Sequence, residues 1–123
     1  MLDAGAPIVG LDCTDRPRPP GGAAWRDLVR MIRDAGRAVF ADISTLDEGL
    51  AAAEAGADYL ATTLSGYTEA TATGATGPDL ALVTALARAQ EVPVVAEGRF
   101  ATPAQAAEAL VAGAHAVVVG TMI

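Results

Sequence analysis

The sequence has 123 residues, and its 15 acidic and 8 basic side chains give a formal net charge of -7. At roughly 100–200 residues per domain, this length fits a single domain or part of one. Hydrophobic residues make up 52% of the chain, which excludes an intrinsically disordered segment because enough apolar surface exists to offset ordering entropy. The acidic balance argues against a nucleic-acid binder, since binding to the phosphate backbone needs clustered positive charge.

Membrane, secreted and zinc-binding classes are also disfavoured. The longest apolar run, 114–120, is shorter than the ~18–20 residues that span a bilayer, and the N-terminus shows no signal-peptide pattern. Cys13 is the only cysteine and His115 the only histidine, so this chain can build neither an internal disulfide nor a Cys/His zinc site. We therefore expect a cytoplasmic protein that binds no metal and contacts no membrane.

Five short apolar runs predict β-strands, and four helix-length stretches alternate with them. In chain order the predicted elements are a strand at 7–11, a helix at 24–35, a strand at 38–41, a helix at 46–55, a strand at 59–62, a helix at 79–89, a strand at 92–96, a helix at 103–112 and a strand at 116–119. The strands are nearly all apolar, which predicts coverage on both faces. The strict alternation predicts a parallel α/β sheet with right-handed crossovers.

Local signals support these boundaries. Thr45 with Glu48, and Thr102 with Gln105, have the spacing of a capping box at a helix start. Glycines stand at 5, 36, 56 and 113, just before predicted strands, where the left-handed conformation that closes a helix is needed. Trp25 and Met31 are expected in the core of the first helix.

Two architectures fit this pattern: a five-stranded flavodoxin-like sheet, and a part of a (β/α)8 barrel. Residues 1–5 resemble the last turn of a helix, and Ile123 follows the last strand closely, so the ends favour the partial barrel. Segments 15–22 and 65–78 are long loops that follow the carboxyl ends of strands. Parallel α/β folds keep their sites at those ends.

Three carboxylates also end predicted strands, namely Asp12, Asp42 and Glu97. At this position they could serve a catalytic site, or they could cap helices or pair with nearby arginines. A site role is favoured for Asp42 and Glu97, because other residues are available to cap the helices that follow. Asp12 remains open between the two interpretations.

Two further patterns follow strand ends. Gly98-Arg99 and Gly120-Thr121 could offer backbone amides to a phosphate group, or could be ordinary turns. The hydroxyl-rich stretch 62–68 could bind sugar hydroxyls, or could be a simple polar loop. His115 and Cys13 are expected to be structural.

These motifs together resemble the bacterial N-acetylmannosamine-6-phosphate 2-epimerases (N-acylglucosamine-6-phosphate 2-epimerases). The shared stretches, in the order of the family, are 11–19 (LDCTDRPRP), 41–45 (ADIST), 48–50 (EGL), 62–68 (TTLSGYT), 78–80 (PDL), 96–99 (AEGR) and 117–120 (VVVG). The resemblance covers essentially the whole chain. It implies that residues 1–123 form an incomplete TIM-barrel domain of about five parallel strands and four helices, matching strands 4 to 8 of the epimerase barrel.

The resemblance also implies an isomerase of sialic acid catabolism that inverts C2 of N-acetylmannosamine 6-phosphate without a metal or cofactor. Glu97 matches the family's acid/base glutamate, and Asp42 matches a residue that orients the substrate. Further substrate contacts are expected from Asp12, Thr63, Ser65 and Tyr67. The phosphate is expected at Gly98, Arg99, Gly120 and Thr121.

The sequence departs from the family pattern in several places. It contains no lysine, whereas the family uses a lysine on the third barrel strand, and Ala61 replaces a usual glycine. The resemblance therefore implies that this chain alone is an impaired epimerase. The alternatives are a degenerate half-barrel that binds a sugar phosphate or only assembles, and a flavodoxin-like binding module, which would not explain residues 62–68. An incomplete barrel has open sheet edges, so we expect a homo-oligomer.

Overall fold

Nine elements alternate along the chain in the computed structural model, which describes residues 5–17, 24–72 and 76–120. They are β1 (Ile8–Asp12), α1 (Trp25–Asp34), β2 (Ala38–Asp42), α2 (Leu46–Ala55), β3 (Tyr59–Ala61), α3 (Leu80–Ala89), β4 (Val94–Glu97), α4 (Pro103–Ala112) and β5 (Ala116–Val118). All five strands and four helices predicted from the sequence are confirmed, with boundaries that differ by two residues at most.

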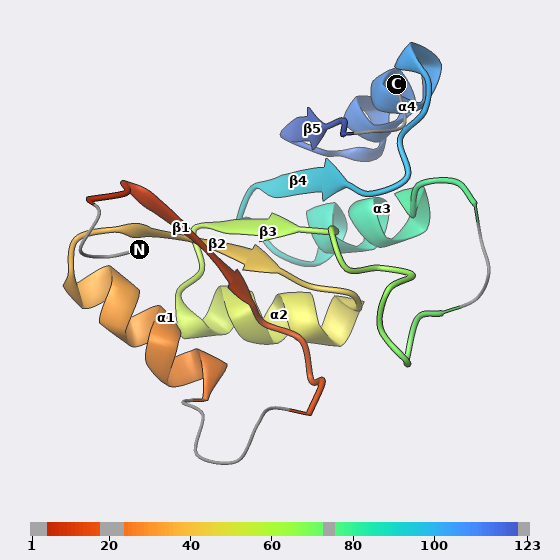
Figure 1. Cartoon of the computed structure of the whole chain (residues 1–123). Helices are drawn as coiled ribbons and strands as arrows, with labels where there is room; N and C mark the ends of the chain where they lie inside the picture. The colour runs from red at the N-terminus through yellow and green to blue at the C-terminus, as the bar shows by residue number, and fades with distance from the viewer. Residues whose placement is uncertain (1–4, 18–23, 73–75, 121–123) are drawn as a thin grey trace.

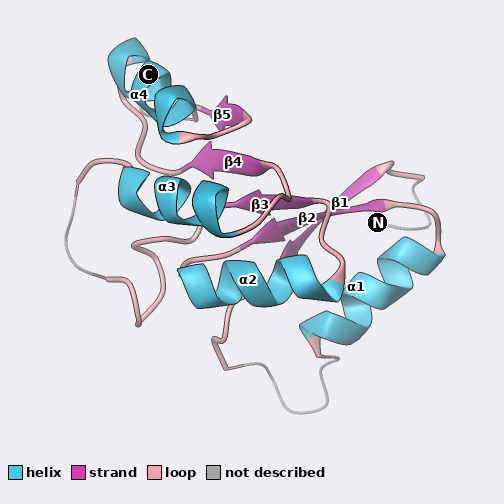
Figure 2. Cartoon of the chain, turned by 180° about the vertical axis from the view of Figure 1, so that it is seen from behind, coloured by secondary structure: helices cyan, strands magenta, loops and turns pink. Residues whose placement is uncertain are grey.

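The five strands form one parallel sheet in the order β1-β2-β3-β4-β5. A flavodoxin-like sheet has the order 2-1-3-4-5 instead, so the observed order excludes that alternative and agrees with part of a barrel. The four helices lie on the same face of the sheet (Figures 1 and 2). No helix among the described residues is both long and apolar enough to cross a membrane.

The predicted helix caps are present. Thr45 Oγ1 accepts a hydrogen bond from the amide of Glu48 at 3.1 Å, and the Glu48 carboxylate accepts one from the amide of Thr45 at 3.1 Å. Thr102 and Gln105 form the second capping box. Helix α4 ends at Gly113 with φ +117°, where an added Cβ would lie 2.6 Å from the Cβ of Ala87. Glycine is required there both by the backbone angle and by the contact between α4 and α3.

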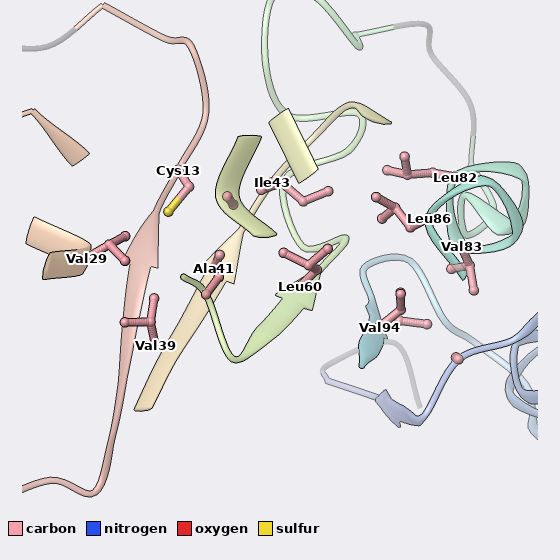
Figure 3. Close-up of a cluster of buried hydrophobic side chains, with 14 of the residues drawn as sticks. Cys13, Val29, Val39, Ala41, Ile43, Leu60, Leu82, Val83, Leu86 and Val94 are labelled. Atoms are coloured by element: carbon pink, nitrogen blue, oxygen red, sulfur yellow. The ribbon is translucent and has the colours of Figure 1, made fainter. Parts of the chain in front are cut away.

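The hydrophobic core fills the space between the helices and the sheet. Figure 3 shows Val29 near Cys13 and Val39, and Leu82, Val83 and Leu86 of α3 beside Val94. Trp25 is buried as predicted, but the prediction for Met31 is wrong, because its side chain is 54% exposed. Trp25, Val29 and Ile32 share the face of α1 toward the sheet, and Met31 lies two residues from Val29, on the other side of the helix.

On the face of the sheet opposite the helices, β1 and β2 carry exposed or half-buried side chains. In β2, Val39 and Ala41 are buried, whereas Ala38, Phe40 and Asp42 are half-buried. The prediction that the strands are covered on both faces is therefore wrong for β2, whereas it holds for β4, in which Val94, Val95 and Ala96 are all buried. Phe40 packs beside Tyr59 on the open face of β2, with 6.3 Å between ring centroids. Alternate residues of a strand share a face, so Asp42 lies on the same open side as Phe40.

Candidate active site

The predicted carboxylates lie along one edge of the sheet. Asp12 and Asp42 are the last residues of β1 and β2 and are direct neighbours in the register, and Glu97 is the last residue of β4. Between β2 and β4 runs β3, which is followed immediately by Thr62 and Thr63. The parallel topology thus gathers residues that lie far apart in the sequence at the carboxyl ends of the strands.

Thr63 connects two of these carboxylates. Its Oγ1 lies 2.9 Å from Oδ1 of Asp42 and 2.8 Å from Oε2 of Glu97. The neighbouring Thr62 fixes the main chain of Glu97, because its hydroxyl donates to the Glu97 carbonyl at 3.1 Å and accepts from the Glu97 amide at 3.1 Å. Two consecutive threonines therefore set the position of Glu97.

The surroundings of Asp42 favour its neutral form. Burial raises the pKa of this carboxyl group above its ordinary value of 3.8, and the negative charges of Glu97 and Asp12 raise it further. The hydrogen bond between Asp42 and Thr63 opposes this shift only in part. Asp42 therefore keeps its proton to a higher pH than an exposed aspartate does.

Asp12 is bound within its own loop. Its Oδ1 accepts hydrogen bonds from the amide of Thr14 at 2.9 Å and from the Thr14 hydroxyl at 2.6 Å, and its Oδ2 pairs with the Arg16 guanidinium. Pairing with a nearby arginine was one of the two interpretations left open by the sequence. A substrate contact for Asp12 stays a prediction.

Glu48 joins two loops at this edge, a role that its capping-box pattern did not reveal. One carboxylate oxygen accepts hydrogen bonds from the Ser44 amide at 2.9 Å and from the Ser44 hydroxyl, and the other accepts the Asp15 amide at 2.7 Å. Burial raises the pKa of Glu48, but these hydrogen bonds and that of the Thr45 amide outweigh it, so the pKa lies below 4.5. Glu48 is thus held ionised as an anchor for the loop that follows β1.

A cavity of about 280 Å³ opens beside Glu97. Its lining includes Glu97, the catalytic candidate, and five residues predicted to bind the substrate or its phosphate, namely Thr63, Tyr67, Gly98, Arg99 and Gly120. Phe100 and Val118 are its apolar neighbours. Tyr67 is 61% exposed at its rim. Thr121, the remaining phosphate candidate, lies outside the described residues.

The side chain of Arg99 holds the loop between β3 and α3. Its Nε donates to the Gly77 carbonyl at 2.7 Å and its Nη1 to the Ser65 carbonyl, and the guanidinium carbon lies 5.7 Å from the centre of the Tyr67 ring. The backbone φ of +61° is rare for a residue other than glycine. A phosphate contact by Arg99 stays a prediction.

Ser65 is also engaged inside this loop. Its hydroxyl is buried and donates to Oδ2 of Asp79 at 2.6 Å, and Asp79 caps α3 by accepting the amide of Leu82 at 3.0 Å. The sequence did not indicate that Ser65 and Arg99 fasten this loop at both ends. A substrate contact for Ser65 stays a prediction.

The residues expected to be structural lie away from Glu97 or inside the core. The amide of His115 donates to the carbonyl of Val94 at 2.8 Å, at the amino end of the sheet, and Cys13 is fully buried. Within the described ranges, no three His, Cys, Asp or Glu side chains are grouped as metal ligands would be.

A larger hollow of about 430 Å³ lies on the outer helical surface, between α1 and α2. Its lining includes Arg30 and Arg33, but Arg33 donates to Asp58 and to the Gly56 carbonyl, and Arg30 lies 3.7 Å from Asp27. It contains none of the residues that end the strands. The cavity beside Glu97 is therefore the candidate active site.

Sequential parallel strands, helices on a single face and carboxylates at the carboxyl edge define this chain as part of a TIM barrel with a strand-end site. A family model named NanE and described as "Putative N-acetylmannosamine-6-phosphate epimerase" matches residues 1–123. The chain belongs to this family, which confirms the resemblance found in the sequence.

Individual relatives support the same family assignment. A protein of Synechococcus elongatus named "Putative N-acetylmannosamine-6-phosphate 2-epimerase" is 50% identical over 121 residues, which is 98% of this chain and 52% of the relative. A protein of Yersinia pestis with the same name is 51% identical over 120 residues, 98% of this chain and 49% of the relative. The solved structure of the N-acetylmannosamine-6-phosphate 2-epimerase from Clostridium perfringens matches with a TM-score of 0.92 and 41% identity, over 99% of this chain and 52% of that one. The chain thus spans about half the length of the relatives that it matches.

Proposed function

We propose that the protein serves the C2 epimerisation that interconverts N-acetylmannosamine 6-phosphate and N-acetylglucosamine 6-phosphate. The observation that carries this proposal is the joining of Glu97 to Asp42 through Thr63, at a cavity lined by Gly98 and Gly120, in a chain of the epimerase family. In this reaction the opened sugar ring presents a C1 aldehyde, which acidifies the C2 proton. A base then removes that proton and the enolate must be stabilised before it is reprotonated on the other face.

Within this proposal Glu97 exchanges a proton with the ring oxygen during opening and closing, and Asp42 orients the substrate. The amides of Gly98, Arg99 and Gly120 bind the phosphate, since backbone N–H groups beyond strand ends suit an anion. Thr63 and Tyr67 face the sugar from the same cavity. We place this chemistry in the cytoplasm, because a sequence with a single cysteine fits a reducing compartment.

The base that removes the C2 proton is the part of the chemistry that these residues do not supply. The sequence contains no lysine, and we propose that the base comes from outside the 123 residues. The second candidate function is a half-barrel that binds a sugar phosphate without turnover. The cavity and its glycine amides would suit that role equally, so binding and turnover need separate measurements.

Binding is tested by titrating the isotope-labelled chain with N-acetylmannosamine 6-phosphate and following amide shifts by NMR. We expect shifts centred on residues 97–99 and 120–121, with a dissociation constant of about 1 mM or weaker, equivalent to about -4 kcal/mol. The Gly98→Ala variant should weaken binding, because φ is +110° there, whereas Gly10→Ala, with nothing within 4 Å of an added Cβ, should not. Shifts that centre elsewhere would contradict the phosphate assignment.

We also propose that copies of the chain associate through the sheet edges. Among the described strands, β1 and β5 are each paired on one side only, which leaves a row of backbone donors and acceptors on the other. Light scattering of the chain at micromolar concentration should therefore give the mass of a dimer or a larger assembly. A well-folded monomer under these conditions would count against the proposal.

A further inference from the structure

The contacts of Thr63 need more protons than its hydroxyl carries. Thr63 Oγ1 lies within 2.9 Å of an oxygen of Asp42 and within 2.8 Å of an oxygen of Glu97. A hydroxyl group has one proton to donate and lone pairs to accept. If both carboxylates were ionised, one of the two contacts would set a hydroxyl lone pair against a carboxylate oxygen. A second proton on one of the carboxyl groups makes both contacts hydrogen bonds.

The surroundings decide which carboxyl group carries this proton. Asp42 is the middle one of three carboxylates, with Asp12 beside it in the register and Glu97 across Thr63. The two arginines at this edge of the sheet interact with other groups: Arg16 pairs with Asp12, and Arg99 donates to the carbonyls of Gly77 and Ser65. In the described part of the chain no arginine forms an ion pair with Asp42. Burial between two anions favours the neutral form of Asp42, in agreement with the raised pKa of this group.

We propose that Thr63 is a positioning residue that shares one proton between Asp42 and Glu97. The protonated carboxyl group of Asp42 donates to Thr63 Oγ1, and the Thr63 hydroxyl donates to the ionised carboxylate of Glu97. The pair then carries a single negative charge, located on the residue that lines the cavity. Thr62 adds to this positioning, because its hydroxyl holds the carbonyl and the amide of Glu97.

The hydrogen-bonded row of Asp42, Thr63 and Glu97 can also move a proton without any co-reactant. When Thr63 passes its proton to Glu97, it takes the proton of Asp42 in the same movement, so that Glu97 becomes the acid and Asp42 the carboxylate. Two O–H bonds are present at each stage: on Asp42 and Thr63 at first, on Thr63 and Glu97 after this movement, and on Thr63 and the sugar once Glu97 has given its proton away. Asp42 is thereby the source that restores the acid form of Glu97 for ring opening, an assignment that rests on the proposed function.

The test is a pH titration of the chain labelled with carbon-13 in its aspartate and glutamate carboxyl groups, followed by NMR without any sugar. We expect the pair to release its two protons in two separate steps, both of which appear at the signals of Asp42 and Glu97. In Thr63→Val the hydroxyl is lost, and the two steps should move about one pH unit closer together, since a hydrogen bond of this kind is worth about 1.4 kcal/mol. Thr63→Ser should restore the separation.

Several outcomes overturn the proposal. They are two independent single steps in the unmodified chain, an unchanged separation in Thr63→Val, or a separation in Thr63→Ser that equals that of the valine variant. The matched control is Thr84→Val on α3, which removes a hydroxyl that contacts neither Asp42 nor Glu97 and should leave both steps unchanged. The unmodified chain and the serine variant decide the matter if the valine variant does not fold. Because no sugar is present, failure here is distinct from failure of the sugar-phosphate titration.

Discussion

A polypeptide of these 123 residues is expected to exchange the C2 proton of N-acetylmannosamine 6-phosphate at least ~10²–10⁴-fold more slowly than a full-length relative. That factor is the typical contribution of one general acid or base, and the chain has no lysine to act as the base. Glu97 could open the ring, but its carboxylate is held by Thr63 at the end of β4. Loss of substrate-positioning side chains from the rest of a barrel would add to the deficit.

Proton NMR in deuterated water measures this exchange directly. Addition of a segment that supplies the first three barrel strands and their lysine should restore exchange, and Glu97→Gln should abolish the restored rate. The matched control is Glu91→Gln, an exposed glutamate on the loop before β4, which should leave it unchanged. Exchange by the chain alone at nearly the rate of a relative, lost on Glu97→Gln, would show that the external base is not needed.

Replacement of Gly113 by alanine is expected to destabilise the fold by about 2–5 kcal/mol. The φ of +117° is costly for any residue with a Cβ, by about 1–2 kcal/mol. The new methyl group would also lie 2.6 Å from the Cβ of Ala87, an atom that cannot move without α3, and overpacking of this kind costs about 1–3 kcal/mol. Both effects act where α4 packs on α3.

Gly36→Ala separates the two effects. Gly36 also has a positive φ, of +76°, but nothing lies within 4 Å of an added Cβ. It should therefore lose only the backbone part, about 1–2 kcal/mol. Urea unfolding followed by circular dichroism at pH 7 measures both variants. Equal losses would show that the contact with Ala87 relaxes freely and that only the backbone angle matters.

Features that depend on neighbouring residues were predictable from the sequence. The capping boxes at Thr45 and Thr102 join groups three residues apart, so their spacing is sufficient to identify them. The alternation of apolar runs and helical stretches was sufficient to place all nine elements. The motifs at 62–68 and 96–99 identified the family, because residue types in a fixed order do not depend on the fold being known.

The orientation of side chains was less predictable. Met31 is apolar and lies in a helix, but only the position of α1 on the sheet shows that it faces away. Arg99 follows a strand end as a phosphate ligand would, yet its guanidinium turns to carbonyls of a loop that begins 34 residues earlier. Such choices depend on which chain segments lie nearby, and the amino-acid pattern does not specify them.

The sequence by itself determined the elements, the parallel α/β class, the family and the three carboxylates at strand ends. Only the tertiary structure decided which of those carboxylates act together: Asp12 pairs with Arg16 in its own loop, whereas Asp42 and Glu97 meet through Thr63. The physical reason is that a parallel sheet brings together residues from different strands according to its order and register. Thr63 lies 21 residues from Asp42 and 34 from Glu97, and the hydrogen bonds among them form only once β2, β3 and β4 are side by side.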